Sequence, residues 1–272
     1  TGRPRIRIGA GSGFSDDRFE PALELAEQGD IDYLVFECLA ERTIARETLA
    51  RFKNPAAGYT PFLRERMRLV LPESLPRGVR IVTNRGAANP IAAARATREE
   101  ARAVGLTPPR VAAVVGDDVT EIIRANPQLP LLESGEPVES LLPRLAAANA
   151  YLGADIVRAA LDTDAHVVVT GRVADPSLFL ACMLHGLGWS YDDLPKLAAG
   201  TFAGHLLECA AQLTGGCFAD FPRKPVEGLA RLGFPYADVT QDGQVTFGKV
   251  EGSGGRLDVA TCTEQALYEL HD

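Results

Sequence analysis

The sequence has no hydrophobic run long enough to cross a membrane. Its 272 residues nowhere contain the roughly 18 consecutive apolar residues that a transmembrane helix needs. The opening residues, TGRPRIRIGAGSG, carry charge but no apolar segment of the kind found in secretory signals. We therefore expect a cytoplasmic protein that does not act on a membrane.

Basic residues are fewer than acidic residues. The chain has 28 Lys and Arg against 36 Asp and Glu, which gives a formal net charge of −8. Proteins that bind nucleic acids need a basic face, so this balance argues against a nucleic-acid partner. It does not exclude a local basic pocket for a small anionic ligand.

Cysteines are few and are not paired in the sequence. There are five, and none forms a CxxC pair. This pattern is typical of free thiols in a reducing compartment, and it favours neither a disulfide framework nor a zinc site. A P-loop, G-x-x-x-x-G-K-[ST], is also missing, which excludes nucleoside-triphosphate hydrolysis of that type.

Short apolar, β-branched runs do recur, with helix-like runs between them. The strand-like runs are residues 5–8, 33–36, 79–83, 111–115 and 166–170. Strands that alternate with helices predict a parallel sheet connected by crossovers. We expect an α/β fold, a predominantly parallel sheet with helices on both faces.

The tail has a different pattern. Residues 236–250 alternate polar and apolar around Asp242-Gly243, which predicts a β-hairpin. We expect a further strand at 257–261 and a last helix at 264–270. The predicted organisation is an α/β ligand-binding or catalytic core over 1–220, with a β-rich extension over 221–272 packed on it.

Polar residues gather where the predicted strands end. Ligands of open parallel sheets bind beyond the carboxyl ends of the strands, so these residues are candidates for a site. They are Ser12, Ser15, Asp16 and Asp17 after the first strand, Glu37 after the second, Asn84 and Asn89 after the third, Asp117 and Asp118 after the fourth, and Arg172 and Asp175 after the fifth.

Helix capping is the alternative explanation for several of them. Ser15, Asp118 and Asp175 each stand where a helix is predicted to begin, and such residues are favoured N-caps. Glu37 directly follows an apolar strand, so its carboxylate needs a cation, a hydroxyl or a metal as partner. Arg172 is a natural counter-charge for a carboxylate or a phosphate.

Three glycines, Gly9, Gly11 and Gly13, follow the first strand-like run and predict a loop before a helix that opens at 15–17. The dinucleotide fingerprint is G-x-G-x-x-G/A, and here Phe14 stands in the place of the third glycine. A nucleotide-dependent oxidoreductase remains an alternative. We expect instead that Gly11, Gly13, Ser15 and Asp16 form a cradle that faces Glu37, Asn84 and Asp117 and binds no pyrophosphate.

His205 and Glu208 stand three residues apart in a run, 198–216, that predicts a helix ended by Gly215-Gly216. They could form an acid–base pair, supply two ligands of a divalent metal, or be a hydrogen-bonded pair inside the core. The spacing alone does not choose among the three.

Five longer blocks together resemble the acyclic terpene utilisation family. They are RIGAGSGFSDDRFEPALELAEQGDIDYLVFECLAERT, IVTNRGAANP, VVGDDV, VTGRVADPSLFL and GTFAGHLLECAAQLTGG. The resemblance implies a place in bacterial catabolism of citronellol- and geraniol-type terpenes, through branched acyl-CoA intermediates. It also implies a C-terminal ferredoxin-like domain, which we expect either in a separate polypeptide or in a longer protein of which this sequence is a part. Arg85 stands where the family's block suggests an apolar residue, which favours a more polar ligand.

Our leading hypothesis is an enzyme that acts on a carboxylate or branched acyl-CoA by lyase, hydratase or hydrolase-type acid–base chemistry. A CoA thioester is the expected substrate, no resident cofactor is predicted, and a divalent metal is a weaker option. A non-catalytic ligand-binding subunit with a small ferredoxin-like partner chain is the alternative, and we expect a homo-oligomer. The catalytic candidates are Asp16, Glu37, Asp117, His205 and Glu208, and the ligand-binding candidates are Gly11, Ser12, Gly13, Ser15, Asn84, Asn89 and Arg172.

Overall fold

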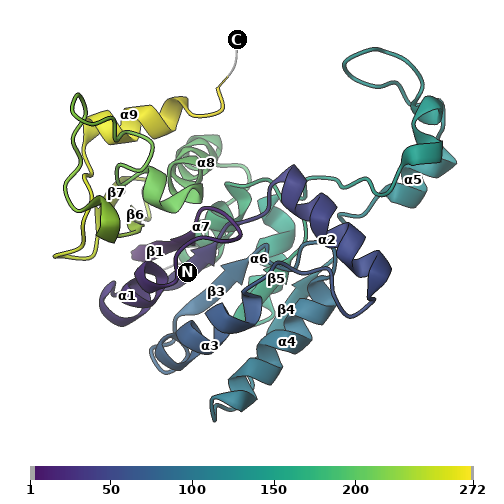
Figure 1. Ribbon diagram of the computed structural model, residues 1–272. Coiled ribbons are helices and arrows are strands. Elements are labelled where there is room, and N and C mark those ends of the chain that lie inside the picture. The colour runs from purple at the N-terminus through teal and green to yellow at the C-terminus, as the bar shows by residue number, and fades with distance from the viewer. Residues whose placement is uncertain (1–3, 271–272) are drawn as a thin grey trace.

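One seven-stranded sheet organises the computed structural model, which describes residues 4–270 (Figure 1). The strand order is β4-β5-β3-β2-β1-β6-β7, and the first five of these strands run parallel. β6 and β7 form an antiparallel hairpin that continues the sheet beside β1. The strands are β1 (Arg5–Ser12), β2 (Tyr33–Phe36), β3 (Arg80–Thr83), β4 (Val111–Val114), β5 (Val167–Thr170), β6 (Pro235–Thr240) and β7 (Val245–Lys249).

Helices cover both faces of this sheet, as predicted. On one face α1 (Glu20–Gln28), α3 (Leu63–Ser74) and α4 (Pro90–Ala103) pack side by side. On the other, α6 (Ala154–Asp162), α7 (Ser177–Leu187) and α8 (Leu194–Glu208) pack in the same way, and α9 (Val259–Leu267) packs against α8. The predicted α/β class and the C-terminal hairpin are therefore confirmed. Within residues 4–270, no helix is long and apolar enough to cross a membrane.

The central strands are apolar because both of their faces are covered. Every residue of β2 and β5 is buried, including the run Val167–Val169. A strand buried on both sides reads as a continuous hydrophobic run rather than an alternating one. This explains why short apolar runs located these strands in the sequence.

The first strand is longer than predicted. β1 continues through Gly9 and Gly11 to Ser12, so these glycines lie in the strand and not in a loop. A Cβ at Gly11 would come within 2.6 Å of the Phe36 ring, so the glycine leaves room for that side chain. α1 begins at Glu20, and the prediction that Ser15–Asp17 opens the helix is wrong: the segment 13–17 is a turn.

Two predictions for the tail are also wrong. Residues 257–261 form no strand, because Asp258 accepts from the backbone N–H groups of Ala260 and Thr261 and starts α9 five residues earlier than expected. α8 does not run to Gly215. It ends at Glu208, and a short 3₁₀ helix, Ala210–Gln212, follows.

Two segments at the carboxyl ends of the strands lie outside the packed layers. α2 (Glu41–Lys53) follows β2 across that edge. The arm, residues 115–151 between β4 and α6, projects from the sheet and contains α5 (Thr120–Ala125) and the 3₁₀ turns Val138–Ser140 and Leu142–Arg144 (Figure 1). The arm and α2 frame one side of the edge where the candidate residues meet.

Candidate functional site

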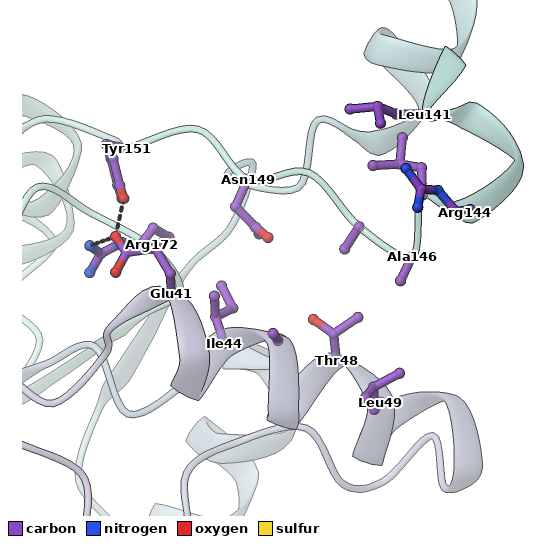
Figure 2. A pocket seen from close by; sticks show the side chains of 13 residues that line it. Glu41, Ile44, Thr48, Leu49, Leu141, Arg144, Ala146, Asn149, Tyr151 and Arg172 are labelled. Atoms are coloured by element: carbon purple, nitrogen blue, oxygen red, sulfur yellow. Dashed lines mark hydrogen bonds and ion pairs between the residues drawn. The ribbon is translucent and has the colours of Figure 1, made fainter. Parts of the chain in front are cut away.

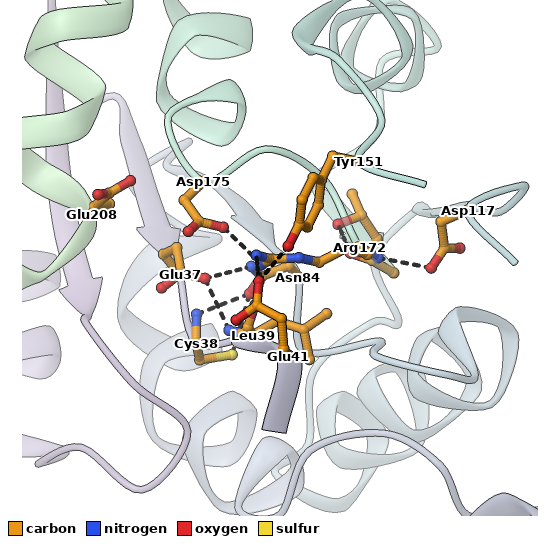
Figure 3. Close-up of polar contacts among 12 residues, drawn as sticks. Glu37, Cys38, Leu39, Glu41, Asn84, Asp117, Tyr151, Arg172, Asp175 and Glu208 are labelled. Carbon is orange, nitrogen blue, oxygen red and sulfur yellow. Dashed lines mark hydrogen bonds and ion pairs between the residues drawn. The ribbon is translucent and has the colours of Figure 1, made fainter. Parts of the chain in front are cut away.

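Side chains from four elements meet at the carboxyl edge of the sheet (Figure 3). Glu37 follows β2, Asn84 follows β3, Arg172 and Asp175 follow β5, and Glu208 ends α8. Parallel strands bring their carboxyl ends to one edge, which is why residues distant in the sequence meet here. The expected convergence of Glu37, Asn84 and Arg172 is found.

Glu37 is a buried acid held by two donors. Its side chain accepts at Oε1 from Asn84 Nδ2 at 2.7 Å and from the Leu39 N–H at 2.8 Å. Only 7% of the residue is exposed, and burial, followed by the negative charge of Asp175, raises the pKa of Glu37 to about 7. Ser12 fixes the same turn from β1, because its hydroxyl donates to the Glu37 carbonyl at 2.7 Å. A carboxyl group with such a pKa can accept or release a proton near neutral pH.

Asn84 serves to position Glu37. Its Nδ2 is used by Glu37, and its Oδ1 accepts from the Cys38 N–H at 3.0 Å and from the Cys38 thiol at 3.2 Å. The amide is fully buried. Any donation from Asn84 Nδ2 to a ligand would therefore compete with the bond to Glu37.

Arg172 donates to three oxygen atoms through Nη1 and Nη2, while its buried Nε has no hydrogen-bond partner. Nη1 donates to Asp175 Oδ1 at 2.7 Å and to the Leu39 carbonyl, and Nη2 donates to Glu41 Oε1 at 3.1 Å. The guanidinium lies 4.3 Å from the centre of the Tyr151 ring, whose hydroxyl donates to Glu41. Two carboxylates thus already balance its single charge.

Glu208 and His205 form the predicted pair, with His205 Nδ1 3.0 Å from Glu208 Oε1. Burial, followed by the charges of Asp175, Glu37 and Glu269, raises the pKa of Glu208 to about 9. Glu208 Oε2 and His205 Nε2 are buried and have no hydrogen-bond partner. Of the three readings, a metal site gains no support, because residues 4–270 hold no group of three metal-binding side chains.

Glu37, Asp175 and Glu208 together form what we call the carboxyl cluster. Burial also raises the pKa of Asp175, which the Arg172 charge opposes. Asp175 does not cap α7, whose N-cap is Pro176 and has no side-chain bond. The three acids come from three elements and interact through their charges. Their mutual repulsion favours retention of protons at neutral pH.

Asp117 and Asn89 hold local backbone. Asp117 Oδ2 accepts from the Arg172 N–H at 2.9 Å and from Asn149 Nδ2 at 3.0 Å. Asn89 caps α4 by accepting from the Ala92 N–H at 3.2 Å. Asp118 likewise accepts from the Thr120 N–H and hydroxyl at the start of α5. A catalytic role for Asp117 stays a prediction.

The turn after β1 does not have the shape of the expected cradle. Asp16 is exposed and accepts from the Ser15 hydroxyl at 2.5 Å, and no described contact joins it to Glu37. Asp17 is the buried acid, and it accepts from the Gly13 N–H at 2.9 Å. A Cβ at Gly13 would lie 2.5 Å from the Cys209 carbonyl, so this glycine permits close packing against the end of α8. The roles of Gly11, Gly13, Ser15 and Asp16 in ligand binding stay predictions.

A groove of about 620 Å³ opens between α2 and the arm (Figure 2). Arg172, Glu41 and Tyr151 stand at one end, and Arg144 stands at the other. Its volume is within the range of pockets for small organic ligands. Its apolar wall consists of Ile44, Ala45, Leu49, Leu141, Leu145, Ala146 and Ala147, and Thr48 and Asn149 add polar groups.

Sequence reasoning missed Glu41, Tyr151 and the groove. Glu41 begins α2 and Tyr151 lies at the end of the arm, and neither follows a strand. The aromatic Tyr151 ahead of a helix carried no motif that could have singled it out. For Asp175 the sequence left helix capping as the alternative to a site role, because its spacing to Arg172 does not reveal that the two form an ion pair.

Comparison with known proteins gives one match. The family model described as acyclic terpene utilisation family protein AtuA matches residues 6–272. Neither a curated protein nor a solved structure matches the chain.

Proposed function

Because the chain belongs to the acyclic terpene utilisation family, we propose that it is a cytoplasmic enzyme acting on a small carboxylate or branched acyl-CoA thioester. The reaction is of the lyase, hydratase or hydrolase type and uses the carboxyl cluster for acid–base catalysis. Family membership supports a role in terpene utilisation, and the cluster supports the chemistry.

The difference in pKa between Glu37 and Glu208 is the observation that carries the proposal. Glu37, at about 7, is partly ionised at neutral pH, whereas Glu208, at about 9, keeps its proton. Pairs of acids whose surroundings separate their pKa values are typical of sites that need one base and one acid. Burial is the largest cause of both shifts.

Each acid has a role in such a reaction. Addition of water to an unsaturated acyl group needs one group that takes a proton from water and one that delivers a proton to carbon. Glu37 in its ionised form takes the first proton, and Glu208 supplies the second. After turnover Glu37 holds the proton taken from water and Glu208 has lost one, so a proton must pass from Glu37 to Glu208 before the next cycle. His205, hydrogen-bonded to Glu208 through Nδ1, is placed to relay it.

The groove offers a place for the acyl part of the substrate. Its apolar wall suits a branched aliphatic chain, and its inner end reaches Arg172, which also touches the carboxyl cluster through Asp175. A chain bound there would direct its polar end toward the cluster.

Turnover and crystal soaking together test the proposal. Purified protein is incubated with a panel of saturated and unsaturated branched acyl-CoA thioesters, and products are identified by mass spectrometry. We expect turnover of at least one of them, and electron density for it in the groove with its reacting carbons near Glu37. Density that lies far from both Glu37 and the groove would refute the proposed site.

The ligand-binding subunit is a second candidate, because the cluster is almost closed to solvent while the groove is open. Glu37 and Glu208 are 7% and 4% exposed. A subunit of this kind would bind a thioester in the groove and convert none of the panel until a partner chain is added. Turnover by this chain alone excludes it.

A dinucleotide site finds no geometric support in residues 9–20. Such a site needs a glycine loop that leads directly into a helix N-terminus. Gly9 and Gly11 lie inside β1, and α1 begins only at Glu20. The oxidoreductase alternative is therefore not proposed.

A further inference from the structure

Arg85 carries an unused pair of donors inside the protein. Its side chain is fully buried, and Nη1 donates to the Ser15 carbonyl at 3.1 Å, the Thr60 hydroxyl at 3.1 Å and the Pro61 carbonyl at 3.2 Å. Nε and Nη2 have no hydrogen-bond partner. These two nitrogens form the side edge of the guanidinium group, which is one of the edges that bind a carboxylate or phosphate with two parallel bonds.

Arg66 adds a second buried cation beside it. Nη1 donates to the Arg18 carbonyl at 2.9 Å and Nη2 to the Asp17 carbonyl, while Nε has no partner. Burial, followed by the positive charge of Arg85, lowers the pKa of Arg66 to about 10. The two guanidinium groups therefore lie close enough to repel each other, and each lies 5.9 Å from the centre of the Phe36 ring.

Neither arginine forms an ion pair with a carboxylate in the described part of the chain. Asp17, whose negative charge acts on Arg66, uses its carboxylate to accept from the Gly13 and Arg18 N–H groups. Arg172 is the contrast, because Asp175 and Glu41 neutralise it. The charge of Asp17 offsets that of Arg66 only in part, since the pKa of Arg66 is still lowered. A buried charge without a full partner is costly, so two neighbouring guanidinium groups in this state call for an anion.

We propose that Arg85 and Arg66 form an oxyanion-binding site, separate from the carboxyl cluster, that takes the carboxylate or phosphate group of a small molecule. The Nε–Nη2 edge of Arg85 supplies two parallel hydrogen bonds, and Arg66 supplies the second charge. The proposal does not depend on the acid–base function, because neither arginine belongs to the cluster.

Backbone geometry beside the site supports it. Phe62 and Ala87 have φ values of +63° and +44°, in the left-handed region that residues other than glycine rarely adopt. Phe62 follows Pro61, whose carbonyl Arg85 binds, and Ala87 lies two residues after Arg85 itself. Strain of this kind is concentrated at ligand-binding sites, where the surroundings enforce it. Phe62 and Asp16 are exposed, so the segments that Arg85 binds reach the surface.

Calorimetric titration of the full chain tests the site, with sodium phosphate and sodium acetate as separate probes at matched ionic strength. We expect saturable binding of one anion per chain by at least one probe. Binding of phosphate alone would indicate a phosphate ligand, and binding of acetate alone would indicate a carboxylate ligand. Binding of both probes would indicate a site that accepts either group. Arg85→Lys keeps the charge but removes the two-donor edge. It should therefore weaken anion binding and raise the dissociation constant by about 10- to 100-fold. Arg68→Lys, an exposed change on α3, the helix that carries Arg66, should not alter the dissociation constant.

Two results would overturn the proposal: no saturable binding of either probe by the unmodified protein, or the same dissociation constant for Arg85→Lys and the unmodified protein. If Arg85→Lys does not fold, crystals of the unmodified protein soaked in phosphate decide the question. Density within hydrogen-bond distance of Arg85 Nε and Nη2 supports the site, and phosphate density confined to other positions contradicts it.

Discussion

Replacing Glu208 by Gln should change how the stability of the protein depends on pH. Gln has nearly the same shape as a protonated Glu and can keep the contact with His205, but it cannot ionise. In the native protein the pKa of Glu208 is raised from 4.5 to about 9, first by burial and then by neighbouring carboxylates. We therefore expect Glu208→Gln to stabilise the protein at alkaline pH and to have little effect at pH 5.

The sign of the effect follows from where the proton is held. Between pH 4.5 and about 9 the folded state keeps a proton on Glu208 that the unfolded state has released. The contribution of this group to stability is thus fully present below pH 4.5 and is lost as the pH rises toward 9. One such proton changes the free energy of unfolding by about 1.4 kcal/mol per pH unit. From pH 5 to pH 8 the change is on the order of 4 kcal/mol, and Glu208→Gln should remove most of it.

Urea denaturation at pH 5, 6, 7 and 8 measures this directly, with the free energy of unfolding fitted at each pH. The stability of the unmodified protein should fall with pH more steeply than that of Glu208→Gln. In both proteins Glu37 also makes the free energy of unfolding fall as the pH rises, because its pKa is also raised, and this decrease is the smaller of the two. Glu121→Gln is the matched control, since its side chain is 84% exposed. Parallel curves for Glu208→Gln and the unmodified protein would refute the account of the cluster.

Two further predictions concern the glycine turn and the groove. Gly13→Ala should lower the free energy of unfolding, measured in urea, by about 1–3 kcal/mol, because the added methyl group meets the Cys209 backbone at 2.5 Å. Gly9→Ala, whose methyl group meets only side-chain atoms at 3.3 Å, should lower it by less. Equal decreases for the two variants would contradict this packing. Leu49→Asp, at a half-exposed position of the groove, should raise the dissociation constant of a branched acyl-CoA about 10-fold in calorimetry, whereas Leu194→Asp, at an exposed position elsewhere, should leave it unchanged. If the two variants have the same dissociation constant, the acyl chain of the ligand does not occupy the groove.

Much of the fold could be predicted because its signals are local. The runs at 33–36 and 166–170 are apolar on both faces, and only a covered parallel strand needs that pattern. The end of β1 could not be predicted in this way. Whether Gly9 and Gly11 lie in a loop or in a strand depends on the Phe36 ring, which approaches Gly11 only after β2 pairs with β1.

The site residues also fall into those that local sequence signals predict and those whose position depends on tertiary packing. Glu37, Asn84 and Arg172 were found because each directly follows a strand, and strand ends meet at one edge. His205 and Glu208 were recognised as a pair by their spacing, but their place beside Asp175 depends on how α8 packs against α7. The groove depends on the arm, whose position above α2 no local pattern encodes.

The central claim is that Glu37 transfers a proton to or from the substrate. The most direct test compares the turnover of a branched, α,β-unsaturated acyl-CoA by the unmodified protein and by Glu37→Gln, with Glu121→Gln as control. Loss of a general base typically lowers the rate by about 10²- to 10⁴-fold. We predict a loss within that range for Glu37→Gln and unchanged turnover for the control. Equal turnover by Glu37→Gln and the unmodified protein would contradict the account.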